Sequence, residues 1–107
     1  MKGLSDTVPE FITKSSGKTQ VNYDVNKITV DTVSGKSKDV YEYEYVEIEG
    51  EFTRDKVIAG LLLVNYDYDE QIAILNNYAS DPTDPTEFNS YQAARTDAKV
   101  IADRIDY

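Results

Sequence analysis

The spacing of the apolar residues changes once along the chain, near Gly50, and this change constrains the fold most. Before Gly50, apolar and polar residues alternate, which is typical of strands with one buried face. After it, apolar residues recur every three or four positions, which is typical of amphipathic helices. No strand-like segment separates the helical ones, so a parallel βαβ sheet is excluded. We predict an α+β fold: an N-terminal antiparallel β-meander of about three strands, packed against three C-terminal α-helices.

Two short strands and one long strand are predicted in the first half. Apolar and polar residues alternate in residues 21–25 and again in residues 28–31. Asn26 and Lys27 lie between these segments and favour a two-residue turn, and hence a β-hairpin. The long strand follows a second turn and covers residues 39–49.

The long strand changes phase along its length. Tyrosines occupy its odd positions up to Tyr45, whereas Val46 and Ile48 place the apolar residues at even positions. A shift of one residue exchanges the two faces of a strand. The pattern therefore predicts either a β-bulge near Tyr45 and Val46, or a sheet whose faces are covered over different lengths.

Helix starts are well marked in the second half. Thr53 is a suitable N-cap for a helix over residues 54–65, and Asp67 with Glu70 has the spacing of a capping box. In the helix that this box opens, four apolar residues at helical spacing are predicted to face the core: Tyr68, Ile72, Leu75 and Ala79.

The third helix is predicted from a different signal. Asp84 is expected as its N-cap, with Pro85 in the first helical position and Glu87 in the third. Its apolar face then extends from Phe88 to Ile105.

Residues 1–18 are rich in Ser, Thr, Gly and Lys and are predicted to form a flexible N-terminal arm. Within this arm, residues 8–13 also fit an edge strand, where Pro9 is tolerated. Residues 19–107 are then expected to form a single α+β domain.

Charge limits the partners. The 107 residues include 11 basic and 20 acidic side chains, a net charge of −9. This charge repels phosphates, which disfavours direct nucleic-acid binding and anionic membranes. Solubility is the simplest explanation of the charge, and a basic protein partner is compatible with it. No signal peptide or membrane span is recognisable and Cys is absent, so we expect a cytoplasmic or virion-associated protein.

Composition also limits the chemistry. The chain has neither Cys nor His, which excludes thiol nucleophiles, His-based triads and Cys/His zinc sites. Residues 35–37 lack the first glycine of a phosphate-binding loop, and residues 67–78 lack the glycine and final glutamate of a calcium loop. We expect no enzyme, cofactor or bound metal. Glu42 and Glu44 share one strand face and are the candidate acid–base pair, although a solvated face explains them more simply.

The tyrosines are the least generic feature. The chain has nine, against three Phe and no Trp. Three of them on one strand face form an aromatic ladder of a kind enriched at protein interfaces. An alternative is that the helices cover these rings as core. The candidate interaction surface consists of Tyr41, Tyr43 and Tyr45, with Glu42 and Glu44 on the opposite face.

The segments Tyr41–Phe52 (YEYEYVEIEGEF) and Phe88–Ile105 (FNSYQAARTDAKVIADRI), with the helical hairpin between them, resemble small proteins encoded among phage and prophage genes of gut bacteria. The resemblance covers residues 39–105 and lies in the pattern of residue types and in the order of the elements. It implies a virion, tail-assembly or host-interaction accessory, and it assigns no residue a role.

Three hypotheses on function follow. The first is a non-enzymatic interaction or structural accessory protein that binds another protein through the tyrosine face or the hairpin edge, with self-association left open. The second is an acidic DNA mimic that inhibits a nucleic-acid-binding protein. The third is an enzyme that uses Glu42 or Glu44, and it requires a carboxylate held in a cleft.

Overall fold

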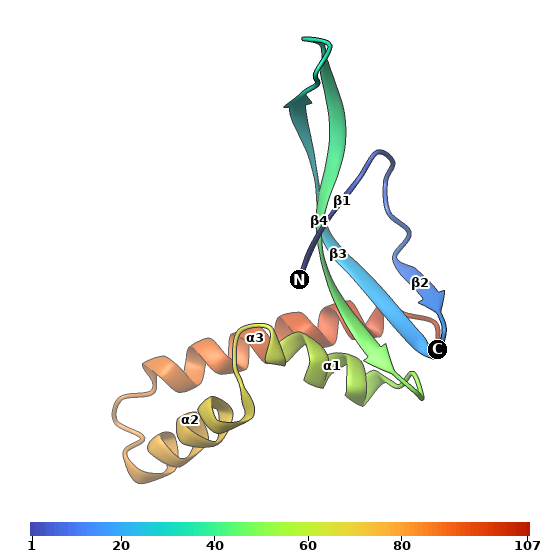
Figure 1. Cartoon of the computed structure of the whole chain (residues 1–107). Helices are drawn as coiled ribbons and strands as arrows, with labels where there is room; N and C mark the ends of the chain where they lie inside the picture. Colours follow the sequence, from blue (N-terminus) through green and yellow to red (C-terminus); the bar gives the residue numbers. More distant parts are fainter. The chain divides into compact units, whose positions relative to one another are not determined.

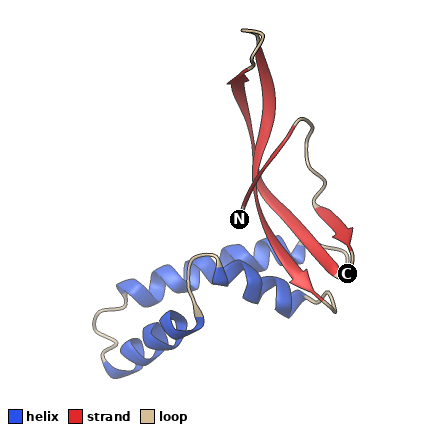
Figure 2. Ribbon diagram, in the orientation of Figure 1, coloured by secondary structure: helices blue, strands red, loops and turns tan.

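The computed structural model describes all 107 residues, and its contacts divide the chain into two compact units (Figures 1 and 2). Met1–Glu51 forms a β-sheet and Phe52–Tyr107 contains the helices. The predicted α+β class, with strands first and helices after them, is confirmed. The boundary between the units follows residue 51, whereas the sequence suggested one domain from residue 19 onward.

The sheet has four antiparallel strands instead of about three, in the order β1-β4-β3-β2. Two long strands form its centre and a short strand flanks each of them (Figure 1). The bounds of the strands are β1 Lys2–Ser5, β2 Ile12–Ser15, β3 Lys18–Asp31 and β4 Ser37–Glu49.

Both outer strands come from residues 1–18, the segment that the sequence suggested as a flexible arm. Polar contacts tie this segment to β3. The backbone amide of Asn22 donates to the carbonyl of Phe11 at 2.8 Å, and its side chain donates to the carbonyl of Glu10 at 2.7 Å. Asn22 is 3% exposed, so these bonds satisfy a buried amide. Composition did not indicate them because backbone groups, which every residue carries, provide much of the contact.

The predicted hairpin turn at Asn26 and Lys27 is wrong, because both residues lie inside β3. Tyr23 pairs with Glu44 and Asn26 pairs with Glu42, so two residues of β3 oppose one of β4. This β-bulge shifts the apolar residues from odd to even positions without a turn. Asp24 in the bulge has a φ of 50°, in the left-handed region that Asp tolerates better than most residues.

Of the two alternatives predicted for the long strand, the bulge near Tyr45 and Val46 is wrong, since the register shift lies in β3, opposite Tyr43. β4 runs through this region in unbroken pairing. One face of β4 is polar in its middle and apolar near its end. It carries Glu42 and Glu44 first, and then the buried Val46 and Ile48.

The helical unit contains α1 Arg54–Leu63, α2 Tyr68–Ser80 and α3 Thr86–Asp103. α3 packs against both other helices (Figure 1). Arg54 at the start of α1 pairs with Asp103 at the end of α3, and Tyr78 near the end of α2 stacks on Phe88 near the start of α3. Both helix pairs are therefore antiparallel. The buried residues of this unit are Val57, Ile58, Leu61, Leu62, Ile74, Tyr91, Ala98, Ala102 and Ile105. None of the helices combines the length and the apolar character that a bilayer crossing requires.

Two of the three predicted helix caps are confirmed. The Thr53 hydroxyl accepts from the amide of Lys56, and Asp67 and Glu70 form the reciprocal capping box. The prediction of Asp84 as a cap is wrong by one residue. Pro85 is the N-cap of α3 and makes no side-chain cap bond, while Asp84 accepts from the hydroxyl of Thr86 at 3.1 Å.

The predicted inner face of α2 is wrong as well. Its apolar residues Tyr68, Ile72 and Leu75 are 62%, 57% and 42% exposed. The contacts of α2 with α3 come instead from a face about a quarter turn away, which includes Gln71 and Tyr78 and the buried Ile74. Tertiary contacts have thus selected a more polar face of this helix than the one that its apolar periodicity favoured.

Candidate interaction surfaces

The three tyrosines of β4 lie on one face of the sheet and are half-buried. Tyr43 and Tyr45 contact each other, with ring centroids 6.1 Å apart and planes tilted by 46°. Tyr41 pairs with Lys27 of β3 and with Ser5 of β1. The ladder predicted from the sequence therefore exists, and it is neither fully exposed nor fully buried.

Tyr43 has a structural role in this ladder. Its cross-strand partner in β1 is Gly3, and a side chain at Gly3 would collide with the Cζ and Oη atoms of the Tyr43 ring. The ring therefore lies over the glycine and fills the space that a Cβ would take. Aromatic side chains cover edge-strand glycines in this way, which pins the register of the short strand.

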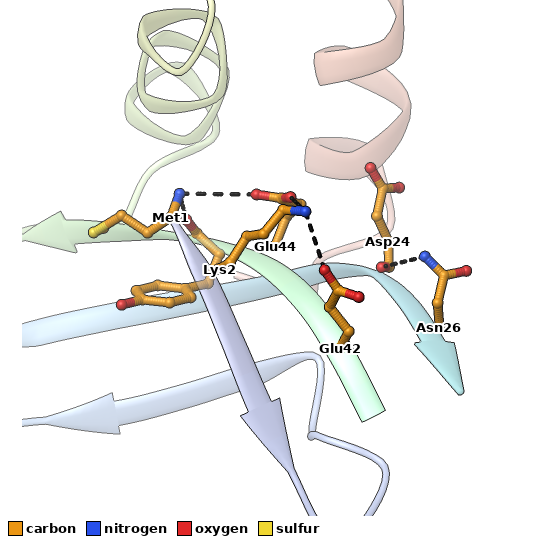
Figure 3. Close-up of polar contacts among 7 residues, drawn as sticks. Met1, Lys2, Asp24, Asn26, Glu42 and Glu44 are labelled. Carbon is orange, nitrogen blue, oxygen red and sulfur yellow. Dashed lines mark hydrogen bonds and ion pairs between the residues drawn. The ribbon is translucent and has the colours of Figure 1, made fainter. Parts of the chain in front are cut away.

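Glu42 and Glu44 lie on the opposite face, where they hold the N-terminus (Figure 3). The Lys2 Nζ donates to Glu42 Oε1 at 3.0 Å and lies 3.8 Å from Glu44 Oε1. The amino group of Met1 lies 3.9 Å from Glu44 Oε2 and donates to the carbonyl of Tyr45 at 3.2 Å. These carboxylates raise the pKa of Lys2, chiefly through the hydrogen bond that Lys2 donates to Glu42.

Other carboxylates of the sheet are paired with lysines in the same way. Lys18 lies 3.6 Å from Glu47 and 3.5 Å from Glu49, and Lys27 lies 3.2 Å from Asp39. The hydroxyl of Thr29, with Lys27, holds the pKa of Asp39 below its usual value. Much of the acidity that the sequence concentrates in β4 is therefore balanced across the strands.

The exposed apolar residues of α2 form a second surface. We define the α2 stripe as the residues at relative positions 0, 4, 7 and 11 of one helix face: Tyr68, Ile72, Leu75 and Ala79. At 1.5 Å per residue, it extends for about 16 Å. The apolar periodicity was visible in the sequence, but the sequence did not indicate that this face points to solvent.

The surroundings of the α2 stripe carry charge of one sign. Residues 57–94 contain no Lys or Arg, and their six carboxylates lie in α2, in its flanking turns and in the first turn of α3: Asp67, Asp69, Glu70, Asp81, Asp84 and Glu87. Three of the six line a hollow of about 460 Å³ beside the stacked rings of Tyr78 and Phe88, whose centroids are 3.9 Å apart.

No group of three or more carboxylates has an arrangement that could hold a metal ion. No protein-family model, curated protein or solved structure matches the chain.

Proposed function

We propose that the chain is a non-enzymatic protein-interaction module whose partner presents a basic, amphipathic helix. The observation that carries this proposal is the α2 stripe, a row of exposed apolar residues within a segment that has no basic side chain. Apolar rows at this spacing are the anchors by which helices pack against one another. Most small soluble domains scatter their exposed apolar residues singly, so an aligned row indicates a contact surface.

Charge selects the partner. Six carboxylates and no cation in residues 57–94 repel an acidic segment and attract a basic one. A second copy of the chain would bring the same carboxylates against these, so self-association through the α2 stripe is disfavoured. A basic helix with an apolar face offers both complementary charge and complementary anchors. The resemblance to phage accessory proteins makes a phage structural protein a suitable source of such a helix.

The tyrosine face is a second candidate surface of the same function. Its rings are half-exposed and mix apolar area with polar tips, as protein interfaces do. Near it, β1 pairs with β4 only over residues 41–44 and β2 pairs with β3 only over residues 18–21, so parts of both long strands have an unpaired edge. An extended partner segment adds to edges of this kind.

The other two hypotheses have less support. A DNA mimic needs rows of unpaired carboxylates, but Lys2, Lys18 and Lys27 pair with those of the sheet. An acid–base enzyme needs a carboxylate in an apolar cleft, but Glu42 and Glu44 instead anchor the N-terminus.

Fluorescence anisotropy with a labelled model helix tests the proposal. The probe is a peptide of Leu and Lys whose leucines follow helical spacing. One control replaces each Lys with Glu, and the other scrambles the order. The full chain should bind only the first peptide, because it alone combines basic charge with an apolar row.

Matched variants of the chain locate the binding. Ile72→Gln combined with Leu75→Gln removes the anchors while keeping good helix formers at exposed positions, and should weaken binding at least about tenfold. Val100→Gln changes an equally exposed residue of α3, also 57% exposed, and should leave binding unchanged. Equal binding by both variants would show that charge alone attracts the peptide, and the proposal would then be wrong.

A matched pair also tests the tyrosine face once a native partner is isolated. Tyr41→Ala lies on that face, and Tyr23→Ala removes a half-buried tyrosine from the opposite one. Loss of partner binding in Tyr41→Ala alone would support a contact there, and equal binding by both variants would remove this surface from the proposal.

A further inference from the structure

A groove of about 500 Å³ follows the seam between α1 and α3. The Arg54–Asp103 pair, with Nε 2.6 Å from Oδ1, marks one end of the seam. The hydrogen bond from the Tyr91 hydroxyl to Gln71 Oε1, at 2.8 Å, marks the other. The volume of the groove lies within the range of small-ligand sites, which is about 300–1,000 Å³.

Arg95 lines this groove, and one donor of its guanidinium has no partner in the chain. Its Nε is buried and has no hydrogen-bond partner. A buried donor without a partner costs free energy, and such groups in folded proteins usually have an acceptor. Because this atom has almost no accessible surface, an acceptor from outside the chain reaches it only when the Arg95 side chain turns toward the groove.

The charges in the groove favour an acceptor with one negative charge. Arg54 is already paired with Asp103, which holds the pKa of Asp103 below its usual value. Lys99 follows Arg95 by one helical turn and also lines the groove, and Asp55 is the one acidic residue in the lining. Two remaining cations against one carboxylate leave an excess of one positive charge.

The α1 wall of the groove begins with the charged Arg54 and Asp55 and is apolar beyond them, where Ile58, Ala59 and Leu62 line it. A guanidinium binds a planar carboxylate through two parallel hydrogen bonds, and the adjacent apolar wall suits a hydrocarbon body. We infer that this groove binds a small monocarboxylate with an apolar body, with Arg95 holding the carboxylate and α1 contacting the body. This inference goes beyond the proposed function, and Tyr68 is the one residue of the α2 stripe that also lines the groove.

Calorimetry and NMR on the full chain test the inference with 4-phenylbutyrate as the probe. Acetate lacks the body, 4-phenylbutyramide lacks the charge and inorganic phosphate lacks the planar carboxylate. We expect 4-phenylbutyrate to bind at least about tenfold more tightly than each of the others and to shift the Arg95 Nε–H signal and the Ile58 and Leu62 methyl signals. Binding of phosphate or acetate as tight as that of 4-phenylbutyrate would overturn the inference, as would the absence of binding.

Two substitutions provide the matched test, one within α3 and one at its C-cap. Arg95→Gln should lose binding, and Arg104→Gln, the same change outside the groove lining, should keep it. Arg95→Lys keeps the charge but loses the planar guanidinium that donates two parallel hydrogen bonds, and it should bind the probe more weakly than the wild type. Circular dichroism checks that each variant folds. If Arg95→Gln does not fold, the test is the set of methyl signals that 4-phenylbutyrate shifts in the wild type. Shifts confined to residues outside the groove would contradict the inference.

Discussion

Single residues in this chain have roles that their type does not reveal. Tyr43 appears in the sequence as one rung of an aromatic ladder, but its ring covers Gly3 and so helps to hold β1. Glu42 and Glu44 appear as a candidate acid–base pair, but they pair with Lys2 and the amino terminus. In both cases the partner lies in the first three residues, where composition indicated only a flexible arm.

Tyr43→Ala should therefore uncover Gly3 and loosen β1. Loss of a cross-strand aromatic pair costs about 0.2–1 kcal/mol, and we expect urea unfolding to show a decrease in this range. In NMR spectra of the wild type, the ring should shift the Gly3 α-protons upfield, and the variant should lose that shift. Unshifted Gly3 protons in the wild type would contradict the contact.

Among the helices and strands, the features that depend on a few neighbouring residues were predicted correctly. The features that depend on contacts between elements were not. The Thr53 cap and the Asp67–Glu70 box depend on a few consecutive residues, and both are confirmed. The phase change in residues 21–31 was visible, but alternation alone does not distinguish a turn from a bulge. The buried face of α2 depends on Gln71 and Tyr78 contacting α3, which no local pattern indicates.

The cap assignments make a paired prediction. Asp67→Ala removes a side chain that accepts from the amide of Glu70 at 2.7 Å, and it should lower the free energy of unfolding by about 1 kcal/mol. Asp84→Ala removes a carboxylate that caps no helix amide and should have a clearly smaller effect. Chemical denaturation of both variants checks this, and an equal loss in the two would contradict the assigned start of α3.

At the scale of the whole molecule, the net charge of −9 has a distinct distribution. In the sheet, lysines pair with many of the carboxylates. Residues 57–94, in contrast, contain six carboxylates and no Lys or Arg. The five basic residues of the helical unit lie within residues 54–56 and 95–104. The two halves of the sequence have similar totals of charge, so composition alone does not reveal this separation.

The ion pairs make the stability depend on pH at its acidic end. Arg54 lowers the pKa of Asp103. A carboxyl with a lowered folded pKa contributes stability above its unfolded pKa of about 3.9, and this contribution is lost as pH falls through the folded value. Urea midpoints between neutral pH and about pH 2 should therefore fall less steeply in Arg54→Gln than in the wild type. Parallel curves would show that this pair does not contribute.

Chemical-shift mapping tests whether the α2 stripe binds a basic amphipathic helix. The labelled full chain is titrated with the Leu–Lys peptide, and the amides that move are assigned. We predict the largest shifts in Tyr68–Ser80, centred on Ile72 and Leu75, with small shifts around Val100. Shifts spread over acidic residues of both units, or concentrated in the sheet and absent from α2, would contradict binding at the α2 stripe.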